Sequence, residues 1–111
     1  IYHNDVTACV GNSPYAEGFI FENENDICGY GMIAKSFSTE FGKPCIWIED
    51  LYLKEEYRGE GIGSSFFVYL EKEFPNTIMR LEVEEDNTRA VTVYKKNGYE
   101  TLPYMEMKKN L

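Results

Sequence analysis

The sequence predicts a single α/β domain in which a central, mostly antiparallel sheet is flanked by helices. The first half of the chain holds three segments rich in aromatic and β-branched residues, bounded by turn-forming residues, which is typical of successive antiparallel strands. The second half holds two segments with helical periodicity and a short alternating segment between them. A strand, a helix and a strand in this order favour a parallel pair, so we expect a mixed sheet.

The three antiparallel strands are predicted at residues 18–22, 27–37 and 45–53. The sequence Asn-Glu-Asn-Asp at residues 23–26 consists of turn formers, so the first two strands should form a hairpin. The loop at residues 40–44 contains a glycine and a proline and leads into the third strand.

The first helix is predicted at residues 61–74. Phe66, Leu70 and Phe74 recur at four-residue spacing, which places them on one face of a helix. Pro75 follows directly and cannot continue the helix. The simplest interpretation of this aromatic stripe is core packing.

Residues 78–84 alternate between polar and apolar side chains, as in a strand with one buried face. A second helix is predicted from Asn87, which suits the N-cap position, to about Asn97. Gly98 then suits the position after the helix end, where a positive φ is common. Residues 99–108 are predicted to form a final strand, which the proline within it places partly at an edge or bulge.

Composition limits the class of protein. The 111 residues suffice for one small domain, and 43% hydrophobic and 15% aromatic residues argue against disorder. No apolar run approaches the ~20 residues of a membrane span, so no membrane partner is expected. Eleven basic against nineteen acidic residues give a net charge of −8, which opposes nucleic-acid binding and favours attraction of cationic small molecules.

The cysteine and histidine content predicts no metal site. Cys9, Cys28 and Cys45 are an odd number without C-x-x-C spacing, so neither a disulfide framework nor a zinc site is indicated. His3 has no sequence neighbours that suggest a triad or a metal site. Free thiols fit a reducing compartment, and we expect a cytoplasmic protein.

A glycine-rich loop lies at residues 58–63 (Arg-Gly-Glu-Gly-Ile-Gly), between a predicted strand and a predicted helix. Glycines let the backbone approach a phosphate, the first N–H groups of a helix lack internal acceptors, and the helix dipole favours negative charge there. The predicted ligand is therefore a pyrophosphate.

Two other phosphate-binding motifs fit this loop less well. A dinucleotide fingerprint needs G-x-G-x-x-G, but its third glycine falls on Ser64. A P-loop needs Gly-Lys-Ser/Thr, whereas Gly63 is followed by Ser64 and Ser65. A glycine turn that binds no ligand is an equally good interpretation of the loop alone.

With these residues the chain resembles the GNAT superfamily of acetyl-CoA-dependent N-acetyltransferases. Its pyrophosphate loop, Arg/Gln-x-x-Gly-x-Gly/Ala, is matched by Arg58, Gly61 and Gly63. Its second signature, an Asn, a small residue, a Tyr and a closing Gly-Tyr/Phe, is matched downstream by Asn87, Tyr94 and the Asn-Gly-Tyr at residues 97–99. Residues 48–64 look most like the diamine (spermidine/spermine-type) branch.

The resemblance implies a GNAT acyl-CoA acyltransferase-like fold and acetyl transfer from acetyl-CoA, with CoA as product, to a primary amine of a small cationic substrate, by direct attack in a ternary complex. It covers the chain from about residue 18 to the C-terminus. The family's N-terminal strand and two helices are not evident in the 16 or so residues before it. We therefore interpret residues 1–111 as one GNAT domain that is incomplete at its N-terminus.

The resemblance also assigns cofactor contacts, most of them through the backbone. The strand entering the glycine loop would hold the pantetheine arm, and the loop and first helical turn would hold the pyrophosphate. The cofactor-binding residues so implied are Leu51, Tyr52, Leu53, Arg58, Gly59, Glu60, Gly61, Ile62, Gly63, Ser64 and Asn87. A main-chain N–H near Leu51 could face the developing oxyanion. Asn87 would also be an N-cap in either case.

Glu49 is the expected general base, acting directly or through a water, because it matches the glutamate of the diamine branch. An apolar pocket would raise its pKa, and strand alternation would turn Asp50 to the other side. The alternative is a solvated carboxylate.

Tyr94 is the expected acid that protonates the departing thiolate, since it matches the family tyrosine and lies two helical turns from Asn87. The alternative is a core aromatic.

Arg80 and Glu82 align with substrate-contacting positions of the diamine branch, although both could be the solvated face of a strand. Trp47 packs in the core or lines the acceptor pocket, and the sequence does not decide which. The rival function is a non-catalytic acyl-CoA-binding or interaction module with the same fold. A homodimer is also expected, because an open sheet edge invites pairing with a second chain.

Overall fold

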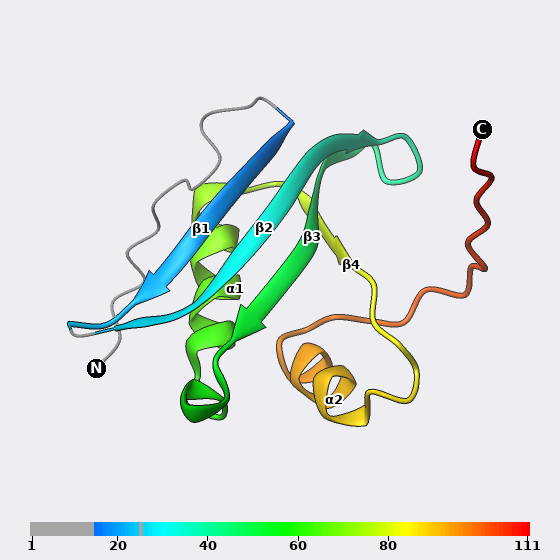
Figure 1. Cartoon of the computed structure of the whole chain (residues 1–111). Helices are drawn as coiled ribbons and strands as arrows, with labels where there is room; N and C mark the ends of the chain where they lie inside the picture. Colours follow the sequence, from blue (N-terminus) through cyan, green and yellow to red (C-terminus); the bar gives the residue numbers. More distant parts are fainter. Residues whose placement is uncertain (1–14, 25) are drawn as a thin grey trace.

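The computed structural model describes residues 15–24 and 26–111. They form one four-stranded sheet of order β1-β2-β3-β4 and two α-helices (Figure 1). In chain order the elements are β1 (Ala16–Glu22), β2 (Ile27–Ser38), β3 (Lys43–Leu53), a short 3₁₀ helix (Glu55–Tyr57), α1 (Ile62–Glu73), β4 (Ile78–Leu81) and α2 (Thr88–Lys96).

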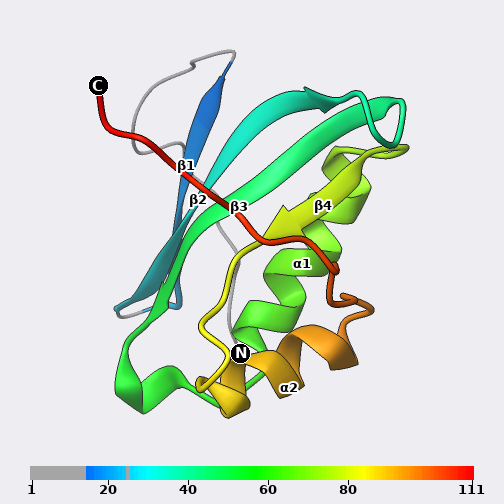
Figure 2. The same cartoon turned by 90° about the vertical axis from the view of Figure 1, so that its right-hand side faces the viewer.

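The sheet is mixed, as the sequence predicts. β1 pairs antiparallel with β2, and β2 pairs antiparallel with β3. β4 then pairs parallel with β3, from Cys45 opposite Ile78 to Ile48 opposite Leu81. The crossover between these parallel strands carries α1, which covers one face of the sheet (Figure 2).

The sheet has a β-bulge at Glu49. Met32 pairs with Asp50, whereas the next residue of β2, Ile33, pairs with Ile48, so Glu49 is the extra residue of β3. A bulge shifts the alternation of side chains along the strand. Before it Ile48 belongs to the core, and after it Leu51 packs against the core. The sequence does not reveal this shift.

β3 and β4 part after four paired residues. β4 ends at Leu81, earlier than the predicted end at residue 84, whereas β3 continues to Leu53. Among the described residues, no strand pairs with β3 beyond Ile48 on the side of β4. The second half of β3 therefore presents backbone N–H and C=O groups along a free edge.

The hydrophobic core lies between α1 and the sheet. It contains the aromatic stripe of α1, with Phe66 and Leu70 fully buried, against Phe19 and Phe21 of β1. Phe66 lies 5.4 Å from Phe19 and 4.9 Å from Phe21, between ring centroids. The interpretation of the stripe as core is confirmed.

Residues 99–108 do not form the predicted final strand: no helix or strand follows α2, and residues 100–111 are exposed. A strand needs a neighbour for its backbone groups, and no described strand pairs with this segment. Pro103 also lacks an N–H to donate. The segment instead passes β4 and projects away (Figure 1), and the Tyr104 hydroxyl donates to the Glu40 carboxylate.

Gly31 on β2 makes the close approach of α1 possible, and this predicts a cost for a side chain there. A Cβ at Gly31 would lie 2.9 Å from the Phe66 ring, so Gly31→Ala should lower the free energy of unfolding by about 1–3 kcal/mol. Gly63→Ala is the control, because its Cβ would meet only Leu51 Cδ2, at 4.0 Å. Urea unfolding of both variants tests this, and equal stability of the two would contradict it.

Candidate active site

The glycine loop has the conformation that its composition predicts. Gly59 and Gly61 have φ angles of +79° and +84°, which side chains rarely adopt. Gly61 is the N-cap of α1, no side chain caps this helix, and its first internal bond runs from Ser65 N to Gly61 O. The N–H groups of the first three helical residues, 62–64, therefore have no acceptor within the helix.

The surface above the loop is open. A Cβ built on Gly61 meets no atom within 4 Å, and one on Gly59 meets only the Arg89 guanidinium, at 3.9 Å. The Ile62 side chain turns into the core, so that only its backbone can face a ligand at the loop. An anion can thus approach these N–H groups directly, with the dipole of α1 in its favour.

Two arginines flank the loop. The Nε of Arg58 donates to the Leu53 carbonyl at the end of β3, 3.0 Å away. Arg89, in the first turn of α2, reaches to within 3.9 Å of the position that a Cβ would take at Gly59. No local sequence signal marks Arg89 as a site residue, because only the fold brings the start of α2 to the loop.

A hydrogen-bonded cluster connects the β1–β2 turn to the chain just before the loop. Lys54 Nζ and Tyr57 Oη donate to the Asp26 carboxylate, at 3.2 Å and 3.1 Å. The Lys54 hydrogen bond, helped by the Ile27 backbone N–H, holds the pKa of Asp26 below its usual range. These contacts fix the 3₁₀ turn from which the loop departs.

A cavity of about 250 Å³ opens where β3 and β4 part. Its walls come from the free half of β3, from the chain after β4 and from α2, and they include Glu49, Asp50, Leu51, Glu82, Asn87 and Tyr94. Glu49 and Asp50 both line it because of the bulge. The prediction that alternation turns Asp50 to the other side is therefore wrong.

Tyr94 reaches this cavity from α2. Its ring is half-buried and packs against Phe67 and Tyr99, with centroids 5.9 Å and 6.1 Å away. Burial raises the pKa of Tyr94 above that of an ordinary tyrosine, so its hydroxyl loses its proton only at a more alkaline pH than usual. Tyr94 thus both packs against the core and lines the cavity, so the two interpretations of this residue do not exclude each other.

The ends of α2 match the predicted capping. Asn87 Oδ1 accepts from Ala90 N at 3.3 Å, which confirms the N-cap. At the other end Gly98 has a φ of +90°, its N–H donates to Lys95 O, and Tyr99 N donates to Tyr94 O. This paired arrangement is a Schellman motif, which fixes the last turn of the helix and with it Tyr94.

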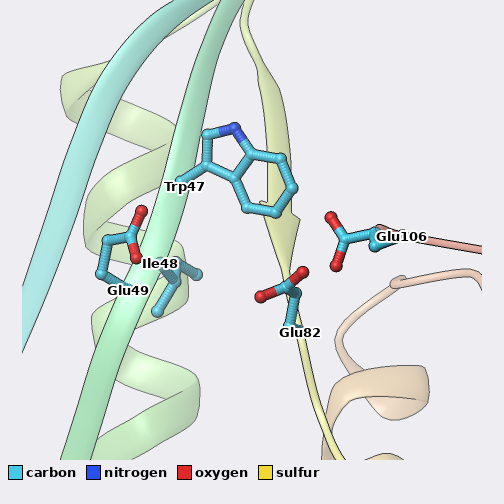
Figure 3. A pocket seen from close by; sticks show the side chains of 5 residues that line it. All are labelled: Trp47, Ile48, Glu49, Glu82 and Glu106. Carbon is cyan, nitrogen blue, oxygen red and sulfur yellow. The ribbon is translucent and has the colours of Figure 1, made fainter. Parts of the chain in front are cut away.

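A second hollow, of about 230 Å³, adjoins the first and shares Ile48, Glu49 and Glu82 with it. Trp47, Glu82 and Glu106 line this hollow, and the carboxylates of Glu82 and Glu106 point toward one another beside the Trp47 ring (Figure 3). Glu106 comes from the C-terminal segment, and no local sequence signal marks it as a site residue.

Other predicted residues lie outside the two hollows. Arg80 lies over the Trp47 ring, 4.6 Å from its centroid, and lines neither hollow. Tyr52 is exposed and stacks with Tyr30 at 5.5 Å, so that only its backbone can serve the site. Leu53 packs against the core.

The chain is similar to known acetyltransferases. Residues 3–99 match the model of the acetyltransferase (GNAT) family. The chain belongs to the GNAT family. The predicted family and fold are confirmed.

Comparisons with individual acetyltransferases support the family assignment. The thialysine N-epsilon-acetyltransferase of Bos taurus is 40% identical over 85 residues, which is 72% of this chain. The chain spans about half the length of the curated relatives it matches, 48% of the bovine protein. A putative acetyl transferase from Pyrococcus furiosus is 26% identical, with a TM-score of 0.72 over 89% of this chain and 68% of that one.

The aminoglycoside N-acetyltransferase AAC(6')-Iy, solved in complex with CoA, has a TM-score of 0.76 over 89% of this chain and 78% of its own. At 14% identity this likeness shows the fold alone.

Burial of Tyr99 at the end of α2 predicts that the free energy of unfolding falls at alkaline pH. Burial, with the charge of Glu71 adding to it, raises the pKa of Tyr99 to about 12, against about 10 when unfolded. Between these values only the unfolded chain loses the proton, so the free energy of unfolding falls as pH rises above 10, by up to about 3 kcal/mol at pH 12. Below pH 10 this contribution is fully present.

Urea unfolding at pH 9, 10 and 11 measures this effect. Tyr99→Phe cannot ionise at this position, so its stability should decline less steeply than that of the parent. Parallel declines in the two proteins would show that Tyr99 ionises freely.

Proposed function

We propose that this GNAT protein is an N-acetyltransferase that moves acetyl from acetyl-CoA to a primary amine of a small cationic substrate, by direct attack in a ternary complex. The observation that carries the proposal is the cavity between the parted strands. It brings Glu49, Tyr94 and the free edge of β3 together, and Leu51 in its wall adjoins the glycine loop through Gly63.

The residues present fit an acyl-CoA. The loop offers unpaired N–H groups, positive-φ glycines and open space, which suit a pyrophosphate. Leu51, Tyr52 and Leu53 would hold the pantetheine arm through the free edge of β3, in the manner of an added strand. When bound, acetyl-CoA supplies the activated acetyl group as a thioester.

Two side chains are proposed to move protons. Glu49 would take the proton of the amine, directly or through a water, and its carboxylate is exposed at the cavity. Tyr94 would give a proton to the leaving sulfur, and its hydroxyl, like that of an unshifted tyrosine, carries that proton at neutral pH. A backbone N–H near Leu51 would face the oxyanion.

The acidic lining favours a cationic amine. Glu49, Asp50, Glu82 and Glu84 line the cavity, and the chain carries a net charge of −8. The bovine relative is named for acetylation of the N-epsilon nitrogen of thialysine, which is an amine. A small diamine-like acceptor is therefore proposed here, with Glu82 rather than Arg80 as the contact.

The proposed setting is a reducing cytoplasm, in which the buried thiols of Cys28 and Cys45 stay free. No helix within the described residues is long and apolar enough to cross a membrane. A homodimer stays a prediction.

The rival function is an acyl-CoA-binding module without turnover. Such a module would use the glycine loop but would not need Glu49 and Tyr94. A thiol-release assay with a panel of amines, run beside a CoA-binding measurement, separates the two. Binding without release for any amine would favour the module.

CoA should stabilise the fold against heat. A ligand bound only by the native state adds about 2.7 kcal/mol at a hundredfold excess over Kd, and Gly61→Val should remove this gain by filling the open space above the loop. Gly42→Val is the matched control, because Gly42 also has a positive φ, of +65°, and open space, but lies in the β2–β3 turn. The control should keep the CoA shift, and a shift retained by Gly61→Val would refute the loop as the binding site.

The two proposed proton carriers should differ in their pH signatures. Glu49→Gln should lose activity mainly at acidic pH and recover as rising pH deprotonates the amine in solution. Tyr94→Phe keeps the ring and its packing, so kcat should fall roughly a hundred- to ten-thousandfold at every pH while the Kd of CoA stays near normal. If Tyr94→Phe turns over like the parent, its hydroxyl is not the acid.

A further inference from the structure

The ends of α1 and α2 are joined by one side-chain contact that the proposed function does not yet use. Asn97, the C-cap of α2, donates through Nδ2 to the Ser64 Oγ in the first turn of α1, at 3.1 Å. We propose that Asn97 is a positioning residue that fixes the Ser64 hydroxyl as a donor to the cofactor's pyrophosphate. This inference rests on the proposed function.

The direction of the contact follows from counting donors. The same Asn97 nitrogen donates to the Val93 carbonyl at 2.9 Å, and a carbonyl oxygen can only accept. The atom facing Ser64 is therefore the NH₂ group of the amide, whose two hydrogens serve Val93 and Ser64. Ser64 Oγ must accept, and its own hydrogen is left to donate elsewhere.

A serine in a helix commonly donates back to the carbonyl four residues before it. Thr92 does this in α2, where its hydroxyl donates to Thr88 O at 2.8 Å. Within the described residues Ser64 makes no such bond, and no other group there accepts its hydrogen. The hydroxyl is half-buried in the same turn as the unpaired N–H groups of residues 62–64.

The Ser64 hydroxyl would thus add a fourth donor to the three unpaired N–H groups of residues 62–64, and the hydrogen bond from Asn97 already restrains its rotation. A donor held in position loses little conformational entropy when the anion binds, which strengthens binding relative to a freely rotating hydroxyl. Hydrogen bonds to charged groups are the stronger class, so the loss should be measurable.

A double-mutant cycle on CoA affinity tests the inference, with Kd measured by calorimetry on the parent, Ser64→Ala, Asn97→Ala and the double variant. Ser64→Ala should raise Kd roughly tenfold. Asn97→Ala should raise it several-fold in the parent and change it less than twofold once Ser64 is alanine. Ser64→Thr, which keeps the hydroxyl, should stay within about threefold of the parent.

Thr92→Val is the matched control, because it removes a helix hydroxyl that is committed within α2, and its Kd should equal that of the parent. If Ser64→Ala and Asn97→Ala raise the Kd of CoA independently, so that their fold-changes multiply in the double variant, this inference is overturned and the proposed function is not. An unchanged Kd in Ser64→Ala would do the same, even if Asn97→Ala fails to fold. No CoA binding by the parent would instead overturn the proposed function, and this inference with it.

Discussion

The parting of β3 from β4 is the constraint on which the site depends. Only four residues of β3 pair with β4. Beyond them β3 continues to Leu53, whereas β4 ends at Leu81 and the residues after it turn away. The open edge of a strand leaves backbone N–H and C=O groups with water as their only partner, so it is ready to pair with another extended chain. Here the open stretch forms the wall of the cavity, so the unmet hydrogen-bonding capacity lies where a ligand can use it.

The bulge at Glu49 lies at the start of this opening and completes it. By adding one residue to β3, it lets Ile48 and Leu51 both serve the core while two consecutive carboxylates line the cavity. A regular strand would have had to send one of them into the apolar layer on α1. The bulge thus reconciles a dense acidic lining with an intact core.

Much of this fold could be predicted because the signals are local. The strands, the helices, the N-cap at Asn87 and the C′ glycine at Gly98 each depend on a few neighbouring residues, and the structure confirms them. The bulge could not be predicted, since it depends on the register between two strands. Arg89, Asn97 and Glu106 were missed for a similar reason, because they join the site only through contacts between distant elements. The predicted last strand failed because local propensity does not supply a pairing partner.

The cluster around Asp26 makes the β1–β2 turn part of the foundation of the glycine loop. The Asp26 carboxylate accepts hydrogen bonds from Lys54 and Tyr57, and Lys54 N donates to Cys28 O. The β1–β2 turn is therefore hydrogen-bonded directly to the residues that lead into the glycine loop. An exposed hairpin tip normally tolerates grafted peptides or altered length. In this protein, lengthening the tip would act on the loop more than thirty residues away in sequence, which makes it a poor place for a fusion and a sensitive one for a reporter group.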